Sequence, residues 1–178
     1  MKDWNVVVTS YMWQEKRLLQ ELAGLGDFRP SGFTAVILGQ VPEMGEFLEA
    51  LKNLWEKSPF LAEYLSSVVP IRVVFPFTVE NLEERLQEAV RALGPEIEGQ
   101  AFYVRVKRRG HKGEYSSLEV EQALDRFLAD ECCSQGQGCR VDFEAADLIL
   151  VVEAVHNQCG LGLVTREMKE RYPFIKSK

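Results

Sequence analysis

The sequence predicts a mixed α/β (α+β) protein, because strand-like and helix-like patterns alternate along the whole chain. Residues 102–107 alternate apolar and polar side chains, which indicates a strand with one buried face. The continuous apolar run 148–152 is typical of a central strand that is buried on both faces. Residues 117–130, between these two strands, carry apolar side chains at helical spacing.

The first 57 residues are expected to form two strand–helix pairs. The first pair is a strand at 5–10 and an amphipathic helix at 13–24, which ends at two closely spaced glycines. The second pair is an apolar strand at 33–41 and a helix at 44–57, which ends before a Ser-Pro dipeptide. We expect these helices to cover one face of a small sheet.

The second half of the chain repeats this alternation. An expected strand at 68–75 precedes a helix at 79–93, whose apolar stripe ends at Gly-Pro. The later elements are expected as a strand at 101–107, a helix at 117–130, and strands at 148–155 and 161–165.

Length and composition indicate a soluble globular protein of one large or two small domains. The chain has 178 residues, 46% of them hydrophobic and 27% charged, which is enough to build a core. No apolar run approaches the roughly 20 residues of a membrane span, and the first residues lack the apolar region of a signal peptide. We therefore expect a cytoplasmic protein that does not enter membranes.

Basic charge is concentrated in two short segments of an acidic chain. The formal net charge is −6, yet residues 101–115 hold five Lys/Arg against one Asp/Glu, and residues 166–178 hold five against two. Residues 116–165, between them, carry a net charge of −7. Such a distribution argues against indiscriminate nucleic-acid binding and favours a local phosphate site.

The segment 103–117 combines a strand end, a basic turn and the start of a helix. Gly110 and Gly113 bracket His111 and Lys112, which suits a tight turn whose amides approach a ligand closely. Ser116 and the glutamate three residues later have the spacing of a capping box, and helix N-termini favour anions. The pattern predicts a phosphate site, and the alternative is an ordinary solvated turn.

Three motifs carry a resemblance to a known family. Residues 108–113, followed by 116–121 and 141–153, resemble the THUMP domain of tRNA-modification proteins, and 69–75 looks like the entry to that domain. The pattern is most similar to the stand-alone adaptor family that works with a tRNA cytidine acetyltransferase. The resemblance implies a THUMP domain at residues 69–178 and an N-terminal ferredoxin-like subdomain at 1–68.

The same resemblance implies a function. Proteins of this kind engage the acceptor stem and the single-stranded 3′ CCA end of tRNA. The chain is therefore expected to be a non-catalytic adaptor that presents tRNA to a separate enzyme, one that forms N4-acetylcytidine. The alternative is an RNA-binding subunit for thiolation, methylation or pseudouridylation.

Ten residues are predicted to contact RNA. Arginine and lysine side chains bind phosphates, and aromatic rings beside cations stack on unpaired bases. For Tyr172 and Phe174 the alternative is packing onto the sheet, and for Arg72 it is an exposed position with no ligand. Arg108 and Lys112 are both expected to be exposed. The predicted residues are Arg72, Lys107, Arg108, Arg109, His111, Lys112, Ser116, Lys169, Arg171 and Tyr172.

Motifs for catalysis and cofactors are missing from the sequence. It has no nucleophile elbow, phosphate-loop lysine motif or dinucleotide glycine fingerprint, so we predict no catalytic residue, cofactor or metal. A carboxylate cluster of Glu144, Asp147 and Glu153 is one weaker alternative, since two of these residues fit strand ends better. A small metal or redox protein is another, and it would use Cys132, Cys133, Cys139, Cys159 and His156.

Overall fold

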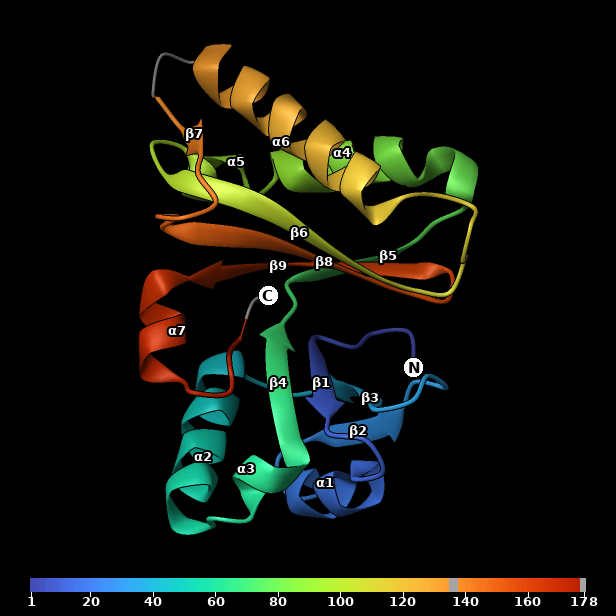
Figure 1. The fold of residues 1–178 in the computed structure, drawn as a ribbon, viewed down its shortest axis with the longest axis vertical. Helices are drawn as coiled ribbons and strands as arrows, with labels where there is room; N and C mark the ends of the chain where they lie inside the picture. The colour runs from blue at the N-terminus through green and yellow to red at the C-terminus, as the bar shows by residue number, and fades with distance from the viewer. Residues whose placement is uncertain (135–137, 177–178) are drawn as a thin grey trace. The chain divides into compact units, whose positions relative to one another are not determined.

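The chain folds into two compact units, shown as a ribbon in Figure 1. The computed structural model describes residues 1–134 and 138–176, without the side chains of 132–134. Unit 1 comprises residues 1–71 and 167–176, and unit 2 comprises residues 72–166. The mixed α/β class expected from the sequence is confirmed.

Unit 1 has a four-stranded antiparallel sheet in the order β2-β3-β1-β4. This order, with one helix after β1 and another after β3, is the ferredoxin-like arrangement that the resemblance implied. Its elements are β1 (Val6–Ser10), α1 (Glu15–Leu22), β2 (Asp27–Pro30), β3 (Val36–Gln40), α2 (Met44–Lys57), α3 (Leu61–Tyr64) and β4 (Leu65–Pro70).

The C-terminal segment 167–176 packs within unit 1, whereas the sequence analysis grouped it with the second domain. Its first residues form the helix α7 (Arg166–Arg171), which begins at the last residue of unit 2. The amide of Val68 in β4 donates to the carbonyl of Phe174 at 2.9 Å. The Phe174 ring is fully buried and lies 5.8 Å from that of Trp55 in α2. Burial of this ring explains why the segment joins unit 1.

Unit 2 has a five-stranded mixed sheet in the order β5-β9-β8-β6-β7. The central strands β6 and β8 are parallel, and β9 runs antiparallel to β8 and β5. Its elements are β5 (Val73–Pro76), the 3-10 turn η1 (Val79–Asn81), α4 (Leu82–Arg91), α5 (Gly94–Ile97), β6 (Ala101–Arg109), α6 (Ser117–Ser134), β7 (Arg140–Val141), β8 (Leu148–Val155) and β9 (Gln158–Thr165).

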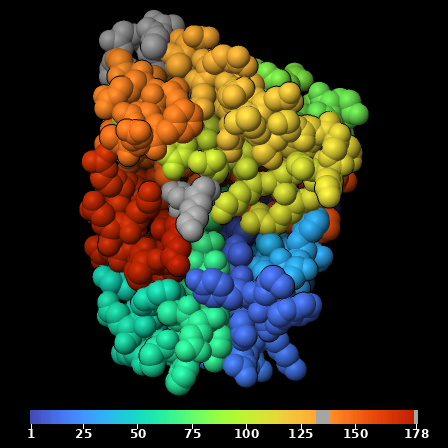
Figure 2. Space-filling view, in the orientation of Figure 1, coloured from blue at the N-terminus to red at the C-terminus, as the bar shows by residue number. Residues whose placement is uncertain are grey.

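Helices α4 and α6 cover the same face of this sheet (Figure 1). The core between them includes Phe102, Val104 and Val106 of β6, packed with the apolar stripes of both helices. The expected alternation in β6 is therefore confirmed, and Tyr103, Arg105 and the later odd-numbered side chains lie on the opposite face. Figure 2 shows atoms of the segment from β6 into α6, in yellow, at the surface.

The observed elements differ from the expected ones at several places. The expected strand 68–75 is split between the two units, since β4 pairs with β1 up to Pro70 and β5 begins at Val73. The short, mostly exposed strand β2 was missed because it lacks a buried apolar face. The helix expected at 117–130 runs to Ser134, so the backbone of Cys132 and Cys133 is helical.

Candidate nucleic-acid interface

The turn after β6 adopts a left-handed backbone at three of its residues. Gly110 has φ 103°, His111 has φ 51° and Gly113 has φ 82°. Glycine adopts such angles without penalty, whereas His111 has to be held there by its surroundings. The amide of Glu114 closes the turn by donating to the carbonyl of His111 at 3.1 Å.

Residues 156 and 157, in the turn between β8 and β9, form hydrogen bonds with this basic turn. The amide of His156 donates to the carbonyl of Arg109 at 3.1 Å, and Nε2 of His111 lies 2.9 Å from Oδ1 of Asn157. The His111 ring also lies 5.5 Å from the ring of Phe77 and 6.3 Å from that of Tyr115. The turn is therefore fixed by contacts from residues far away in the sequence.

His111 also contacts the carboxylate of Glu114, with 3.2 Å between Nδ1 and Oε2. Chiefly because of this hydrogen bond, the pKa of His111 is raised above its ordinary value of 6.5, against a smaller lowering from partial burial. A positive charge on His111 is thus favoured in the folded protein. It adds to the cationic character of the turn.

The start of α6 follows the turn after two residues. The Ser116 hydroxyl accepts from the amide of Glu119 at 3.4 Å, which is one of the two bonds of the expected capping box. A hollow of about 180 Å³ beside it is lined in part by Glu83, Glu119 and Tyr115. Two carboxylates disfavour phosphate there, so an anion is better placed beside the turn's cations.

Most of the predicted arginines already have partners. Arg109 pairs with the buried carboxylate of Glu153 in β8, and Arg72 pairs with Glu96. Arg108 donates to the carbonyl of Gly110 at 3.1 Å, and its guanidinium lies 5.5 Å from the Tyr115 ring centroid. Arg108 is half-buried, so the expectation that it is exposed is wrong, and stacking on Tyr115 is the reason.

Two of the predicted lysines differ from the arginines in their contacts. Lys112 is exposed and Lys107 is half-buried, and neither has a hydrogen bond or ion pair with any residue that the structure describes. Both belong to unit 2, at the turn and at the end of β6. These two ammonium groups are therefore available to an external phosphate without the loss of an internal contact.

The predicted residues of the C-terminal segment lie in unit 1. Tyr172 is 7% exposed, packs on Phe174 at 5.8 Å and donates its hydroxyl to Glu49 at 2.6 Å. Arg171 contacts the same carboxylate at 2.6 Å, whereas Lys169 is exposed. The packing alternative therefore describes Tyr172 and Phe174, and RNA contacts in this segment stay a prediction.

The thiols and carboxylates weighed for chemistry have structural surroundings. Cys159 is fully buried in the core of unit 2, and burial strongly raises the pKa of its thiol. Cys139 is buried as well, while the side chains of Cys132 and Cys133 lie outside the described residues. Within the described part of the chain, no group of three or more His, Cys, Asp or Glu residues is arranged to hold a metal ion.

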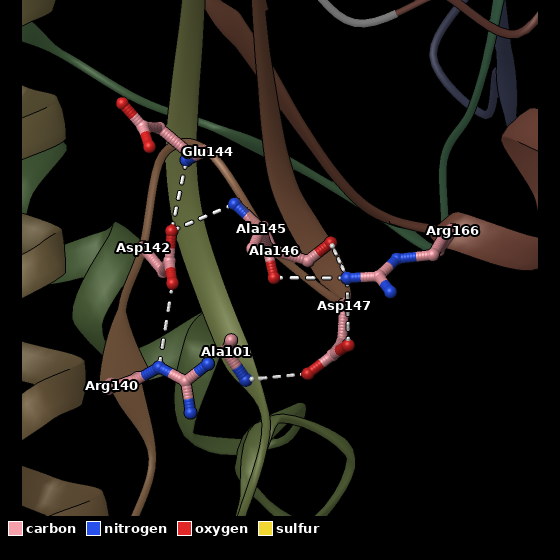
Figure 3. Close-up of polar contacts among 8 residues, drawn as sticks. All are labelled: Ala101, Arg140, Asp142, Glu144, Ala145, Ala146, Asp147 and Arg166. Atoms are coloured by element: carbon pink, nitrogen blue, oxygen red, sulfur yellow. Dashed lines mark hydrogen bonds and ion pairs between the residues drawn. The ribbon is translucent and has the colours of Figure 1, made fainter.

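Asp147 and Asp142 hold the loop between β7 and β8, as Figure 3 shows. The Asp147 carboxylate accepts from the amide of Ala101 at 3.1 Å and lies 3.2 Å from Arg166. Asp142 accepts from the amides of Glu144 and Ala145 at 3.0 and 2.9 Å. The acidic motif of the sequence therefore fixes a loop rather than forming a carboxylate cluster.

Two buried carboxylates of α6 were not predicted from the sequence. Glu121 and Asp125 accept from the amides of Val106 and Val104 at 2.7 and 3.0 Å, along the edge of β6 that β7 leaves unpaired. Burial raises the pKa of Asp125 to about 6. Their spacing of four residues, which interrupts the apolar stripe of the helix, was the available signal.

Comparison with known proteins agrees with this architecture. Residues 79–164 match the model of the THUMP domain family. The tRNA sulfurtransferase of Aeromonas hydrophila is 35% identical over 94 residues, which are 49% of this chain and 19% of that protein. The match confirms a THUMP domain over residues 79–164, and this relative is a sulfurtransferase rather than an acetyltransferase.

Two solved structures share the fold. TrmN from Thermus thermophilus is 21% identical with a TM-score of 0.66, and the match covers 90% of this chain and 45% of that one. A 4-thiouridine synthetase solved with RNA and ATP is 12% identical with a TM-score of 0.52, over 91% and 41% of the two chains. The chain thus spans less than half the length of each relative.

Proposed function

We propose, because residues 79–164 form a THUMP domain, that this chain binds tRNA and presents it to a modifying enzyme on a separate polypeptide. The observation that carries the proposal is the basic turn at residues 110–113, which hydrogen bonds from the β8–β9 turn hold in place. It offers the ammonium groups of Lys107 and Lys112 and the charge on His111 at one end of β6. The acceptor end of the tRNA, with its 3′ CCA, is the part that we assign to this turn.

The chain's own contribution is to bind and to orient. A fixed turn loses little conformational freedom when phosphate binds, so its charges act at full strength. We assign no catalytic role to Cys159, since a buried thiol with a raised pKa is neither a thiolate nor accessible to a substrate. We assign the reaction to the partner enzyme and propose that both proteins act in the cytoplasm.

The chemistry of that partner is the second part of the proposal. The sequence resemblance indicates an acetyltransferase that forms N4-acetylcytidine. The match to a tRNA sulfurtransferase favours thiolation instead. Methylation and pseudouridylation are further members of the same class of reaction. A single experiment separates them: sequencing of tRNA modifications in a deletion strain identifies the nucleoside that is lost.

Binding of tRNA is tested with charge reversal at the free lysine of the turn. Lys112→Glu is expected to weaken binding by about 1–3 kcal/mol, because a charge-assisted contact is replaced by repulsion. Lys16→Glu, at an exposed lysine of α1 in unit 1, makes the same change in net charge and should have little effect. Equal losses in the two variants would mean that only net charge matters and would contradict the proposed site.

The assignment to the acceptor end has its own control. A tRNA without the CCA end should bind the wild type more weakly than intact tRNA does. Lys112→Glu should lose little more on the truncated RNA, because the same contact is already missing. If Lys112→Glu loses as much affinity on truncated as on intact tRNA, the turn contacts another part of the molecule.

A further inference from the structure

An exposed aromatic ring lies beside β6, away from the basic turn. Phe143, in the loop between β7 and β8, is 64% exposed. Its ring lies 5.4 Å from the ring of Tyr103, with 35° between their planes. The guanidinium of Arg105 lies 5.5 Å from the same Tyr103 ring, which is itself 8% exposed. The three side chains form one cluster, in which Phe143 is the ring that is open to solvent.

The backbone on both sides of Phe143 is fixed. The amide of Asp142 donates to the carbonyl of Phe102 at 2.9 Å, and the Asp142 carboxylate accepts from the amides of Glu144 and Ala145. Asp147 and Arg166 fasten the end of the same loop (Figure 3). An aromatic ring on a fixed backbone has little conformational entropy to lose when a flat ligand stacks on it.

Two basic residues of β6 lie between Tyr103 and the basic turn along the strand. Arg105 and Lys107 follow Tyr103 at alternate positions of β6, so all three side chains lie on the same face of the strand. Tyr103 and Lys107 are about 13 Å apart at ~3.3 Å per residue. A nucleic-acid strand carries a phosphate every ~3.4 Å when stacked, so a few nucleotides span this distance.

We propose that Phe143 stacks on an unpaired base of the RNA whose phosphates contact Lys107 and Lys112. This inference rests on the proposed function and adds to it a base-binding position. Arg105 packs against the aromatic pair, with its guanidinium 5.5 Å from the Tyr103 ring and 3.8 Å from the carboxylate of Glu121, which is already its anionic partner. Phosphate itself is assigned to the lysines, since the neighbours of Phe143 are Asp142, which pairs with Arg140 at 3.5 Å, and Glu144.

A base fits this position better than a protein partner does. Stable protein interfaces bury roughly 800 Å² on each side around several apolar anchors. The chain neighbours of Phe143 are acidic, and its aromatic neighbour Tyr103 is buried. A single exposed ring stacks on a base of any sequence, because every base has a π face.

The experiment uses a tRNA acceptor-stem minihelix that carries 2-aminopurine at an unpaired 3′ position. Binding by the wild type should quench its fluorescence, because the base stacks on Phe143. Phe143→Ala should bind at least about fivefold more weakly, as expected for one stacked base, and should lose the quench. Phe143→Tyr keeps the π face and should behave as the wild type does. Phe60→Ala, at a phenylalanine of unit 1 that is 59% exposed, is the matched control.

Three further outcomes are decisive. Phe143→Leu keeps an apolar side chain without a π face, so it serves if the alanine variant does not fold, and it should lose the quench as well. If Phe143→Ala binds and quenches as the wild type does while Lys112→Glu binds poorly, the base-stacking role is wrong and the proposed function stands. If Phe143→Ala binds RNA normally but fails to support modification by the partner enzyme, the ring contacts protein, and the inference is also overturned.

Discussion

At the scale of single residues, His111 links the charge of the turn to pH. Its pKa is raised, chiefly by the hydrogen bond to Glu114. The charged form therefore stabilises the fold below the ordinary pKa of about 6.5, and this contribution is lost as pH rises through the higher folded-state value. The same rise in pH removes a positive charge from the turn.

We therefore expect tRNA affinity to fall as pH increases from about 6 to about 8. Glu114→Gln removes the main cause of the raised pKa, so the His111 titration measured by NMR should move to lower pH. The decline in affinity should move with it. Affinity of the wild type that does not change over this range would show that the charge of His111 does not contribute to RNA binding.

Residue types were easier to predict from the sequence than residue roles. The basic residues of the turn and the capping serine were recognised from local spacing. Which cations stay free depends on partners that are distant in sequence: Arg72 pairs across 24 residues, Arg109 across 44 and Arg171 across 122. Local pattern contains no information about such pairs, so the free lysines could not be separated from the paired arginines.

At the scale of elements, the edge of β6 is protected by side chains rather than by a strand. Glu121 and Asp125 of α6 accept hydrogen bonds from the amides of β6 that a neighbouring strand would otherwise pair with. Burial raises the pKa of Asp125 from 3.8 to about 6, with repulsion from Glu121 as a further cause. An acid whose pKa is raised on folding stabilises the fold below its unfolded pKa. That stability is lost as pH rises through about 6.

Asp125→Asn should therefore stabilise the protein at pH 8 by about 1–3 kcal/mol and have little effect near pH 4. The asparagine oxygen still accepts from Val104, while the buried charge is gone. Urea unfolding at the two pH values measures the difference. Asp130→Asn, at an exposed position of the same helix, is the control. A less stable Asp125→Asn at pH 8 would mean that the charge strengthens the bond to Val104 by more than its burial costs.

The turn between β6 and α6 depends on its second glycine. Gly113 has φ 82°, and a Cβ placed there would meet no atom within 4 Å, so Gly113→Ala tests backbone strain alone. We expect a loss of about 1–2 kcal/mol and weaker tRNA binding, because the turn has to change shape. Gly94→Ala has the same open space without a positive φ and should be neutral or slightly stabilising in thermal unfolding.

Long, strongly patterned elements were predicted well, and short or divided ones were not. β8 and the apolar face of β6 follow from their hydrophobic patterns and are confirmed. The strand expected at 68–75 reads as one apolar run, yet Ile71 and Arg72 belong to different units. The hydrophobic pattern indicates that both halves are strands, but it does not indicate that they belong to different sheets.

At the scale of the whole molecule, a net charge of −6 limits how many phosphates the proposed RNA interface can neutralise. Only a few phosphates can be neutralised by the free cations, so log affinity should fall with log salt at a shallow slope of about −2 to −5. Lys112→Glu should make that slope shallower by about 1, because one phosphate contact is lost. A slope near zero, measured by titration at several salt concentrations, would exclude phosphate contacts as the main source of affinity.

The proposed adaptor role assigns the chemistry to a separate enzyme. The purified chain, given tRNA and ordinary group donors, should leave the RNA unmodified, and modification should appear when the partner enzyme is added. Since Cys159 is buried in the core of unit 2 and is not among the residues proposed to contact RNA, Cys159→Ser should retain partner-dependent modification as long as it folds. Lys112→Glu should lose it at limiting tRNA, while Lys16→Glu should not. Modification by the chain alone, abolished in Cys159→Ser or His156→Ala, would instead assign the chemistry to this protein.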